Sequence, residues 1–120
     1  MARIMISDDS DAIRMVLKDM LTLGDHVVVA EATNGIETVE IFEQVKPDLL
    51  LLDIAMPKKD GKAALMDIMT AQPDAKVVMI TASDNMNAIN ECLQRGAITY
   101  ILKPFDSEEL LKVVSDIFQT

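Results

Sequence analysis

The sequence Leu49-Leu50-Leu51-Leu52-Asp53 joins four apolar residues to a carboxylate. A short apolar run of this kind is typical of a buried strand in a parallel sheet. The first apolar run has the same form, because Arg3-Ile4-Met5-Ile6-Ser7 leads directly into Asp8 and Asp9. If both runs are strands of one parallel sheet, they end at the same edge. We therefore expect Asp8, Asp9 and Asp53 to gather there.

Outward from these two runs, short segments rich in β-branched residues alternate with segments of helical period. The expected strands cover residues 3 to 7, 27 to 32, 48 to 53, 76 to 81 and 98 to 102. The segments between and after them predict five helices. This alternation favours an α/β fold, a doubly wound five-stranded parallel sheet with the flavodoxin-like order 2-1-3-4-5. In such sheets ligands bind where the winding reverses, between the first and third strands.

Length and charge narrow the classes of function. The chain has 120 residues and a formal net charge of −9, which fits one domain over residues 1–120 and disfavours binding to nucleic acid or to anionic membranes. We see no secretory signal and no apolar run long enough for a membrane span, and we expect a cytoplasmic protein. The single cysteine, Cys92, lies on an apolar helical stripe, and we interpret it as a core residue.

Three carboxylates at one edge predict a cation site, because like charges at close range cannot all stay ionised without compensation. Mg²⁺ prefers oxygen ligands and is commonly held by one or two carboxylates together with phosphate oxygens. Zinc is disfavoured, since His26 and Cys92 do not form a set with the usual ligand spacing. We interpret His26 as a residue at the edge of a strand.

Two more strands end in polar residues on the same rim. Thr81 closes Val77-Val78-Met79-Ile80, and Lys103 closes Ile98-Thr99-Tyr100-Ile101-Leu102. Acids, a hydroxyl and an ammonium around a metal are suited to phosphoryl transfer, where charge neutralisation and positioning dominate. A carboxylate can itself be the nucleophile, and Asp53 is our candidate.

With these residues in order, the chain resembles a receiver domain of a two-component response regulator. The resemblance extends from Arg3-Ile4-Met5-Ile6-Ser7-Asp8-Asp9 through residues 52–61, Leu-Asp-Ile-Ala-Met-Pro-Lys-Lys-Asp-Gly, and Ile80-Thr81-Ala82 to Lys103-Pro104-Phe105. Each motif is weak alone, but the ordered set at these spacings is specific. It covers the whole chain.

The resemblance implies a phosphoacceptor at Asp53 and an acid pair at Asp8 and Asp9. It implies that Asp9 ligates Mg²⁺ directly and Asp8 mainly through water, with a carboxylate oxygen of Asp53 and the backbone carbonyl of Ala55 as further ligands. The family varies at the position of Ala55 in ways that affect the lifetime of the phosphate.

The resemblance also assigns the polar residues of the rim. Thr81 would hydrogen-bond the phosphoryl group, Lys103 would pair with its charge, and the bond from Lys103 to Pro104 would be cis. Tyr100 matches the aromatic switch position, which turns inward as the threonine moves toward the phosphate. Ser7 departs from the family, which usually has an aliphatic residue there.

As implied partners we expect a histidine kinase, a downstream protein that binds the face of the fourth helix, fifth strand and fifth helix, and a phosphatase as a further candidate. The protein would be a regulator, monomeric or weakly dimeric, that promotes its own phosphorylation and dephosphorylation rather than an enzyme. Because the chain ends at Thr120 without an output domain, we expect output through protein contact, as in chemotaxis regulators and relay intermediates. A piece of a longer regulator would have the same sequence.

Three alternatives stay open at this point. Asp9-Ser10-Asp11 supplies the D-x-D motif of a phosphohydrolase of the haloacid dehalogenase type. A flavodoxin would need a hydroxyl- and glycine-rich phosphate loop after the first strand, where Asp8 and Asp9 would repel phosphate. A receiver that has lost phosphorylation would act only as a scaffold.

Overall fold

The computed structural model describes residues 1–82 and 85–119, so Thr120, the last residue of the predicted domain, lies outside the described residues. Within them, a five-stranded sheet has the order β2-β1-β3-β4-β5, and every pairing is parallel. The strands are β1 (Arg3–Ser7), β2 (Val27–Ala32), β3 (Leu49–Asp53), β4 (Val77–Ala82) and β5 (Thr99–Lys103). The predicted fold and strand order are confirmed, and the strand ends differ from the prediction by at most one residue.

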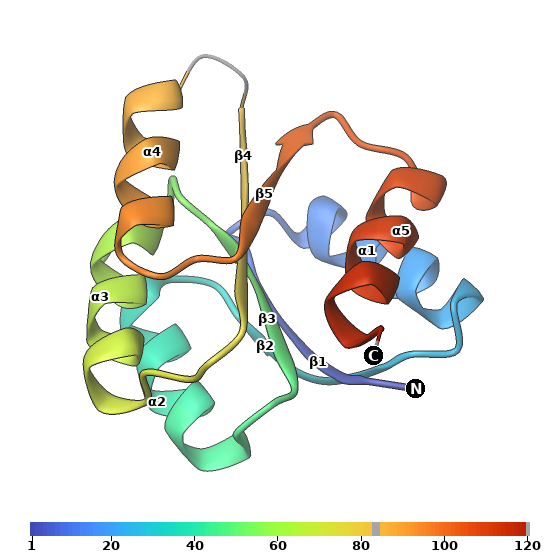
Figure 1. The fold of residues 1–120 in the computed structure, drawn as a ribbon, viewed down its shortest axis with the longest axis horizontal. Helices are drawn as coiled ribbons and strands as arrows, with labels where there is room; N and C mark the ends of the chain where they lie inside the picture. The colour runs from blue at the N-terminus through green and yellow to red at the C-terminus, as the bar shows by residue number, and fades with distance from the viewer. Residues whose placement is uncertain (83–84, 120) are drawn as a thin grey trace.

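The helices alternate with the strands and cover both faces of the sheet. They are α1 (Asp11–Leu23), α2 (Gly35–Val45), α3 (Gly61–Ala71), α4 (Met86–Gln94) and α5 (Ser107–Phe118). Figure 1 shows α1 and α5 on one side of the sheet and α2, α3 and α4 on the other. Polar side chains cap the starts of α1, α2, α3 and α5, for example Asp60, whose Oδ1 accepts a hydrogen bond from the Ala63 N–H at 2.8 Å.

The four leucines of β3 show why the sheet needs both helical layers. Side chains alternate along a strand, so Leu49 and Leu51 belong to the core under α1 and α5, while Leu50 and Leu52 belong to the core under α2, α3 and α4. All four are fully buried. A strand that is apolar on both faces is stable only in the middle of such a sheet, and this places Asp53 at its centre.

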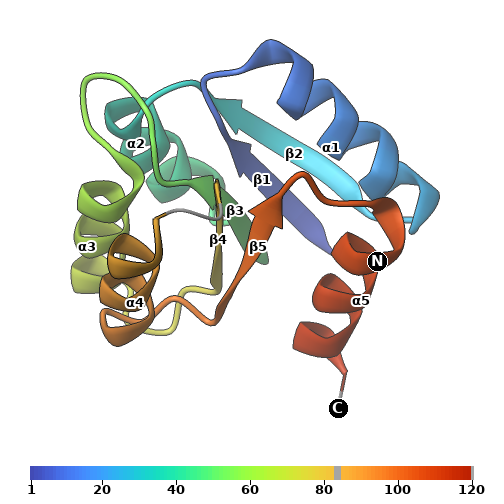
Figure 2. The same cartoon turned by 90° about the horizontal axis from the view of Figure 1, so that it is seen from above.

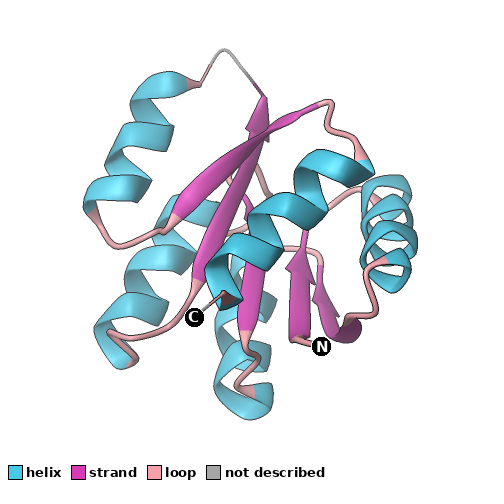
Figure 3. Cartoon of the chain, turned by 45° about the vertical axis from the view of Figure 1, so that its right-hand side comes forward, coloured by secondary structure: helices cyan, strands magenta, loops and turns pink. Residues whose placement is uncertain are grey.

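All strands run toward one edge, which we call the carboxyl edge, and the two chain ends lie toward the opposite, amino edge (Figure 3). The peptide bond between Lys103 and Pro104 is cis, as the resemblance implied. Cys92 is buried, as predicted for a core residue. In the described part of the chain, no helix is both long and apolar enough to span a membrane.

Candidate functional site

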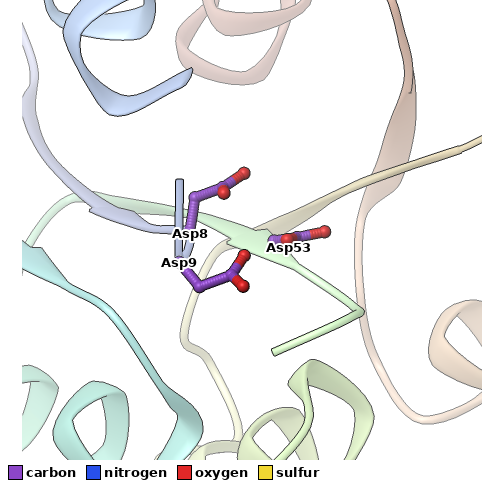
Figure 4. Close-up of side chains that lie close together, drawn as sticks. All are labelled: Asp8, Asp9 and Asp53. Atoms are coloured by element: carbon purple, nitrogen blue, oxygen red, sulfur yellow. The ribbon is translucent and has the colours of Figure 1, made fainter. Parts of the chain in front are cut away.

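Three acids meet at the carboxyl edge because β1 and β3 are neighbours in register. Ser7 pairs with Leu52, so the residues that follow them, Asp8 and Asp53, emerge side by side. One carboxylate oxygen from each of Asp8, Asp9 and Asp53 lies within 4.8 Å of the others. Figure 4 shows these side chains grouped at the ends of the two strands. The predicted cluster is present.

Lys103 reaches this cluster from β5, two strands away from β3. Its Nζ lies 3.0 Å from Asp8 Oδ2 and 3.4 Å from Asp53 Oδ2. Burial disfavours the ammonium, but the nearby carboxylates of Asp8 and Asp53 outweigh it, so the pKa of Lys103 is raised. Lys103 therefore stays charged and is shared between two carboxylates.

Asp53 is a buried acid whose pKa is raised. Only 4% of its surface is exposed. Burial, and then the charge of Asp8, raise its pKa to about 6, although Lys103 acts in the opposite direction. The ionised form of a carboxylate held in this way is stabilised by a cation bound beside it.

An open pocket lies above Asp53. Thr81 is buried at its wall, and among the described residues its hydroxyl makes one contact, a long one of 3.4 Å to the Ala82 carbonyl. That hydroxyl is therefore available to a ligand. The pocket is lined by Asp9, Asp53, Ala55, Thr81, Ala82, Asn85 and Lys103.

The donor set fits a hard divalent cation. Asp8 Oδ2 is buried and receives no hydrogen bond of good geometry from the described residues, although it lies beside the Lys103 ammonium. An orphaned carboxylate oxygen beside two further acids offers the oxygen ligands that Mg²⁺ prefers. His26 lies at the amino edge, where its Nδ1 accepts a hydrogen bond from the Ala2 N–H at 3.1 Å. It does not add a nitrogen ligand here.

Glycine permits a close approach directly behind the acceptor. A Cβ atom on Gly61 would overlap the backbone carbonyl oxygen of Asp53. The Gly61 N–H also donates to the Ile54 carbonyl at 2.7 Å. Gly61 thus fixes the start of α3 against the end of β3.

Sequence reasoning missed two residues near the site. Arg14 donates to the backbone carbonyl of Asp8 at 2.7 Å. The i, i+3 spacing from Asp11 could have indicated a pair between those two side chains, but not the longer contact. Asn85 lines the pocket from the start of α4, and no motif marks it.

Other predicted residues lie outside the acid cluster. Tyr100 is half-buried on β5, and its switch role stays a prediction. The hydroxyl of Ser7 is buried, 3.0 Å from that of Thr38 on α2. Asp11 is 91% exposed at its side chain and pairs with Arg14. The D-x-D alternative is not supported, since its second acid does not join the cluster.

Comparison with known proteins gives a consistent result. The family model described as "Response regulator receiver domain" matches residues 4–115. Chemotaxis protein CheY of Listeria monocytogenes is 39% identical over 114 residues, 95% of this chain and 96% of that protein. Chemotaxis protein CheY of Bacillus subtilis is 37% identical over 113 residues, 94% of each. A chain in the crystal structure of the CheX-CheY-BeF3-Mg+2 complex from Borrelia burgdorferi has a TM-score of 0.93 at 32% identity, covering 98% of this chain and 90% of that chain.

Proposed function

This chain belongs to the response regulator receiver domain family, and is a CheY-like phosphorelay switch; from that premise we propose that Asp53 carries the phosphoryl group. The observation that carries this proposal is the acid cluster itself. Asp53 is the buried acid at the floor of the pocket, with Lys103 and the weakly bonded hydroxyl of Thr81 beside it. The extent of one receiver domain over residues 1–120 is part of the same proposal.

The transfer step balances with a phosphohistidine as donor. A carboxylate oxygen of Asp53 forms a bond to phosphorus while the nitrogen–phosphorus bond of the donor breaks. The electron pair of that bond returns to the imidazole nitrogen, which takes up a proton. The product is an acyl phosphate, which water can later hydrolyse to restore Asp53.

The neighbouring side chains serve this step by charge and position. We assign Lys103, which now bridges two carboxylates, to pair with the phosphoryl oxygens. We assign Thr81 to donate its hydroxyl hydrogen to a phosphoryl oxygen, since its present contact is long. Both assignments rely on charge stabilisation, the dominant factor in phosphoryl transfer.

We assign as Mg²⁺ ligands Asp9, Asp53, the backbone carbonyl of Ala55 and Asp8, the last acting mainly through water. When bound, Mg²⁺ would neutralise charge on the acids and on the phosphoryl oxygens. Asp9 is exposed and borders the pocket, so its carboxylate can reach a bound ion. Asp8 is 1% exposed, and its orphaned Oδ2 suits a water-bridged contact.

We further propose a histidine kinase as the donor and a protein target as the receiver of the signal. The similar structure from Borrelia burgdorferi is a complex of CheX and CheY with BeF3 and Mg²⁺, which supports a protein target for a chain of this family. For this chain we propose that output uses the face of α4, β5 and α5, which carries Tyr100, and that the protein works as a monomer or weak dimer in the cytoplasm. A phosphatase that shortens the signal is a further candidate partner.

The direct test uses a small phosphodonor, such as acetyl phosphate, with Mg²⁺. Intact mass and peptide mapping, under conditions that preserve acyl phosphates, should show one phosphoryl group on Asp53. Asp53→Asn should abolish the adduct, while Asp48→Asn, at the other end of the same strand, should leave it unchanged. An adduct that persists in Asp53→Asn, or one that maps to Asp9, would contradict the proposal.

The metal assignment has its own test. Asp9→Ala should weaken Mg²⁺ binding by about tenfold or more in isothermal titration calorimetry. The variant should fold normally, because the side chain is exposed. An unchanged affinity would remove Asp9 from the set of ligands.

A further inference from the structure

Arg14 on α1 is a largely buried arginine that connects three parts of the carboxyl edge. Only 12% of its side chain is exposed. Its guanidinium donates to the backbone carbonyl of Asp8 at 2.7 Å and to Glu31 Oε1, near the end of β2, at 3.0 Å, and it also pairs with Asp11. Figure 2 shows α1 running beside β2, which brings these groups together. An arginine with fixed donors in three directions can hold backbone in place.

The bond to Asp8 acts on one particular peptide. The carbonyl of Asp8 and the N–H of Asp9 belong to the same planar unit, so fixing that carbonyl orients the start of Asp9. The other side of Asp8 is already held, since its N–H donates to the Ala32 carbonyl at 3.1 Å. Its Oδ1 accepts a hydrogen bond from the Ser10 N–H at 2.9 Å. Arg14 adds a side-chain donor from α1 to the bonds that hold this turn.

We propose that Arg14, anchored by Glu31, is a positioning residue for the metal site: it fixes the Asp8–Asp9 peptide so that both carboxylates face the same cation. This inference rests on the proposed Mg²⁺ site. It adds a residue that contacts neither the ion nor the phosphoryl group and acts through the backbone of its ligands. Glu31 is the anchor because its carboxylate holds the arginine against β2.

Charge and position make opposite predictions for removing Arg14. A positive charge near a cation site repels the cation, so loss of the charge alone should tighten Mg²⁺ binding. Loss of the positioning bond frees the Asp8–Asp9 peptide and should weaken binding. The sign of the change therefore separates the two effects.

Lys18 provides a matched control on the same helix. Its Nζ lies 3.0 Å from Glu31 Oε2, so it shares the anchor of Arg14 and carries the same charge. Its ammonium donates to that carboxylate rather than to the backbone of the acid pair. Lys18→Met removes one charge and the ion pair with Glu31 but keeps the bond to Asp8. Arg14→Met removes one charge, that bond and the ion pairs with Glu31 and Asp11.

The experiment is titration of the full chain with MgCl₂ by isothermal titration calorimetry. Arg14→Met should raise the dissociation constant about tenfold, as expected for one lost charge-assisted hydrogen bond. Lys18→Met should keep it within about twofold of the wild type, or lower it slightly through the lost charge. As a second measurement, Arg14→Met should raise the Mg²⁺ concentration for half-maximal phosphorylation by acetyl phosphate, while the rate at saturating Mg²⁺ stays near the wild-type rate.

Each outcome bears on the inference. An Arg14→Met affinity equal to or tighter than that of the wild type overturns it, and so does an equal weakening in Lys18→Met. If Arg14→Met does not fold, Glu31→Gln takes its place, with a smaller weakening expected, and an unchanged affinity overturns the inference. A wild-type protein that binds no Mg²⁺ defeats the proposed function itself, a result distinct from equal binding by wild type and variant.

Discussion

The strand β3 has an aspartate at each end, and the two are used in opposite ways. Asp48, just before the strand, is exposed and accepts a hydrogen bond from the Arg3 N–H at 2.8 Å. Asp53, its last residue, is 4% exposed, and burial together with the charge of Asp8 raises its pKa to about 6. Asp48 makes a hydrogen bond that stabilises the fold, whereas Asp53 lies where its negative charge destabilises it. The two residues are of the same type, so the edge of the sheet at which each lies decides its role.

The same contrast extends to the rest of both edges. At the amino edge, the Arg3 guanidinium donates to the carbonyls of Lys46 and Val45 at the end of α2, and the Ala2 N–H donates to His26. At the carboxyl edge, Lys103 is shared between two acids. These polar groups of the amino edge have backbone or imidazole partners, whereas two buried acids of the carboxyl edge share one ammonium.

The largest effect should come from the backbone packing behind each edge. Gly61→Ala should destabilise the protein by about 3 kcal/mol, the upper end of the range for overpacking, because its Cβ would overlap the Asp53 carbonyl and backbone cannot move aside cheaply. Gly24→Ala, toward the amino edge, meets the end of the Leu111 side chain, which can rotate, and should cost about 1 kcal/mol or less. Urea unfolding measures both losses of stability, and equal losses would contradict the expected difference between the two glycines.

The next effect tests the cost of charge at Asp53. Without metal, Asp53→Asn should stabilise the protein by roughly 2 to 3 kcal/mol at pH 7.5, because the pKa is raised by about two units on folding and one pKa unit corresponds to about 1.4 kcal/mol. The folded-state pKa of about 6 lies above the unfolded value of about 3.9. As the pH falls, Asp53 therefore takes up a proton in the folded wild type before it does so in the unfolded chain. The destabilisation caused by its charge disappears between about pH 6 and pH 4, and the extra stability of the variant should disappear over the same range.

Urea unfolding in EDTA across this pH range checks the prediction for Asp53. An advantage that is absent at pH 7.5, or that persists unchanged at pH 4, would contradict it. Added Mg²⁺ should stabilise the wild type more than the variant, since the metal needs the carboxylate.

A smaller change in stability, of opposite sign, is expected at the other end of β3. Asp48→Asn should destabilise the protein by about 0.5 to 1 kcal/mol, because an amide oxygen replaces the carboxylate that accepts the Arg3 N–H. Mg²⁺ affinity should stay unchanged, since the substitution lies at the amino edge. Chemical unfolding and calorimetric titration of the same preparation separate the two expectations, and a stabilised variant would erase the difference between the two aspartates.

The carboxyl edge could be predicted from sequence further than the amino edge. Asp8, Asp53 and Lys103 each end an apolar run, and the parallel order of the sheet then brings them together. Arg14 and His26 carry no such signal, because their partners, a backbone carbonyl and a backbone N–H, are not specified by residue type. Polar residues at the ends of apolar runs indicate a site in the sequence. The contacts that support the site depend on distances in the folded chain, which the sequence does not show directly.

The smallest expected effect concerns His26, and it should respond to acid in the opposite direction to Asp53. Burial, and then the charge of the chain's amino terminus, lower the pKa of His26. Its Nδ1 must be unprotonated to accept the Ala2 N–H. As the pH falls below about 6.5, unfolded chains protonate first, so the stability held by neutral His26 is present above that pH and is lost on acidification through the folded-state pKa.

The imidazole is the only one in the chain, so its NMR titration needs no assignment. Its midpoint should lie below about 6.5 in the folded protein. In an Asp53→Asn background, which removes the opposing carboxyl, stability should fall between pH 7 and the His26 midpoint. His26→Gln, whose side-chain oxygen can still accept the Ala2 N–H, should abolish that fall. If the His26 titration midpoint lay at or above the unfolded-state pKa, acid would stabilise the amino edge or leave its stability unchanged. The two edges would then no longer respond to acid in opposite directions.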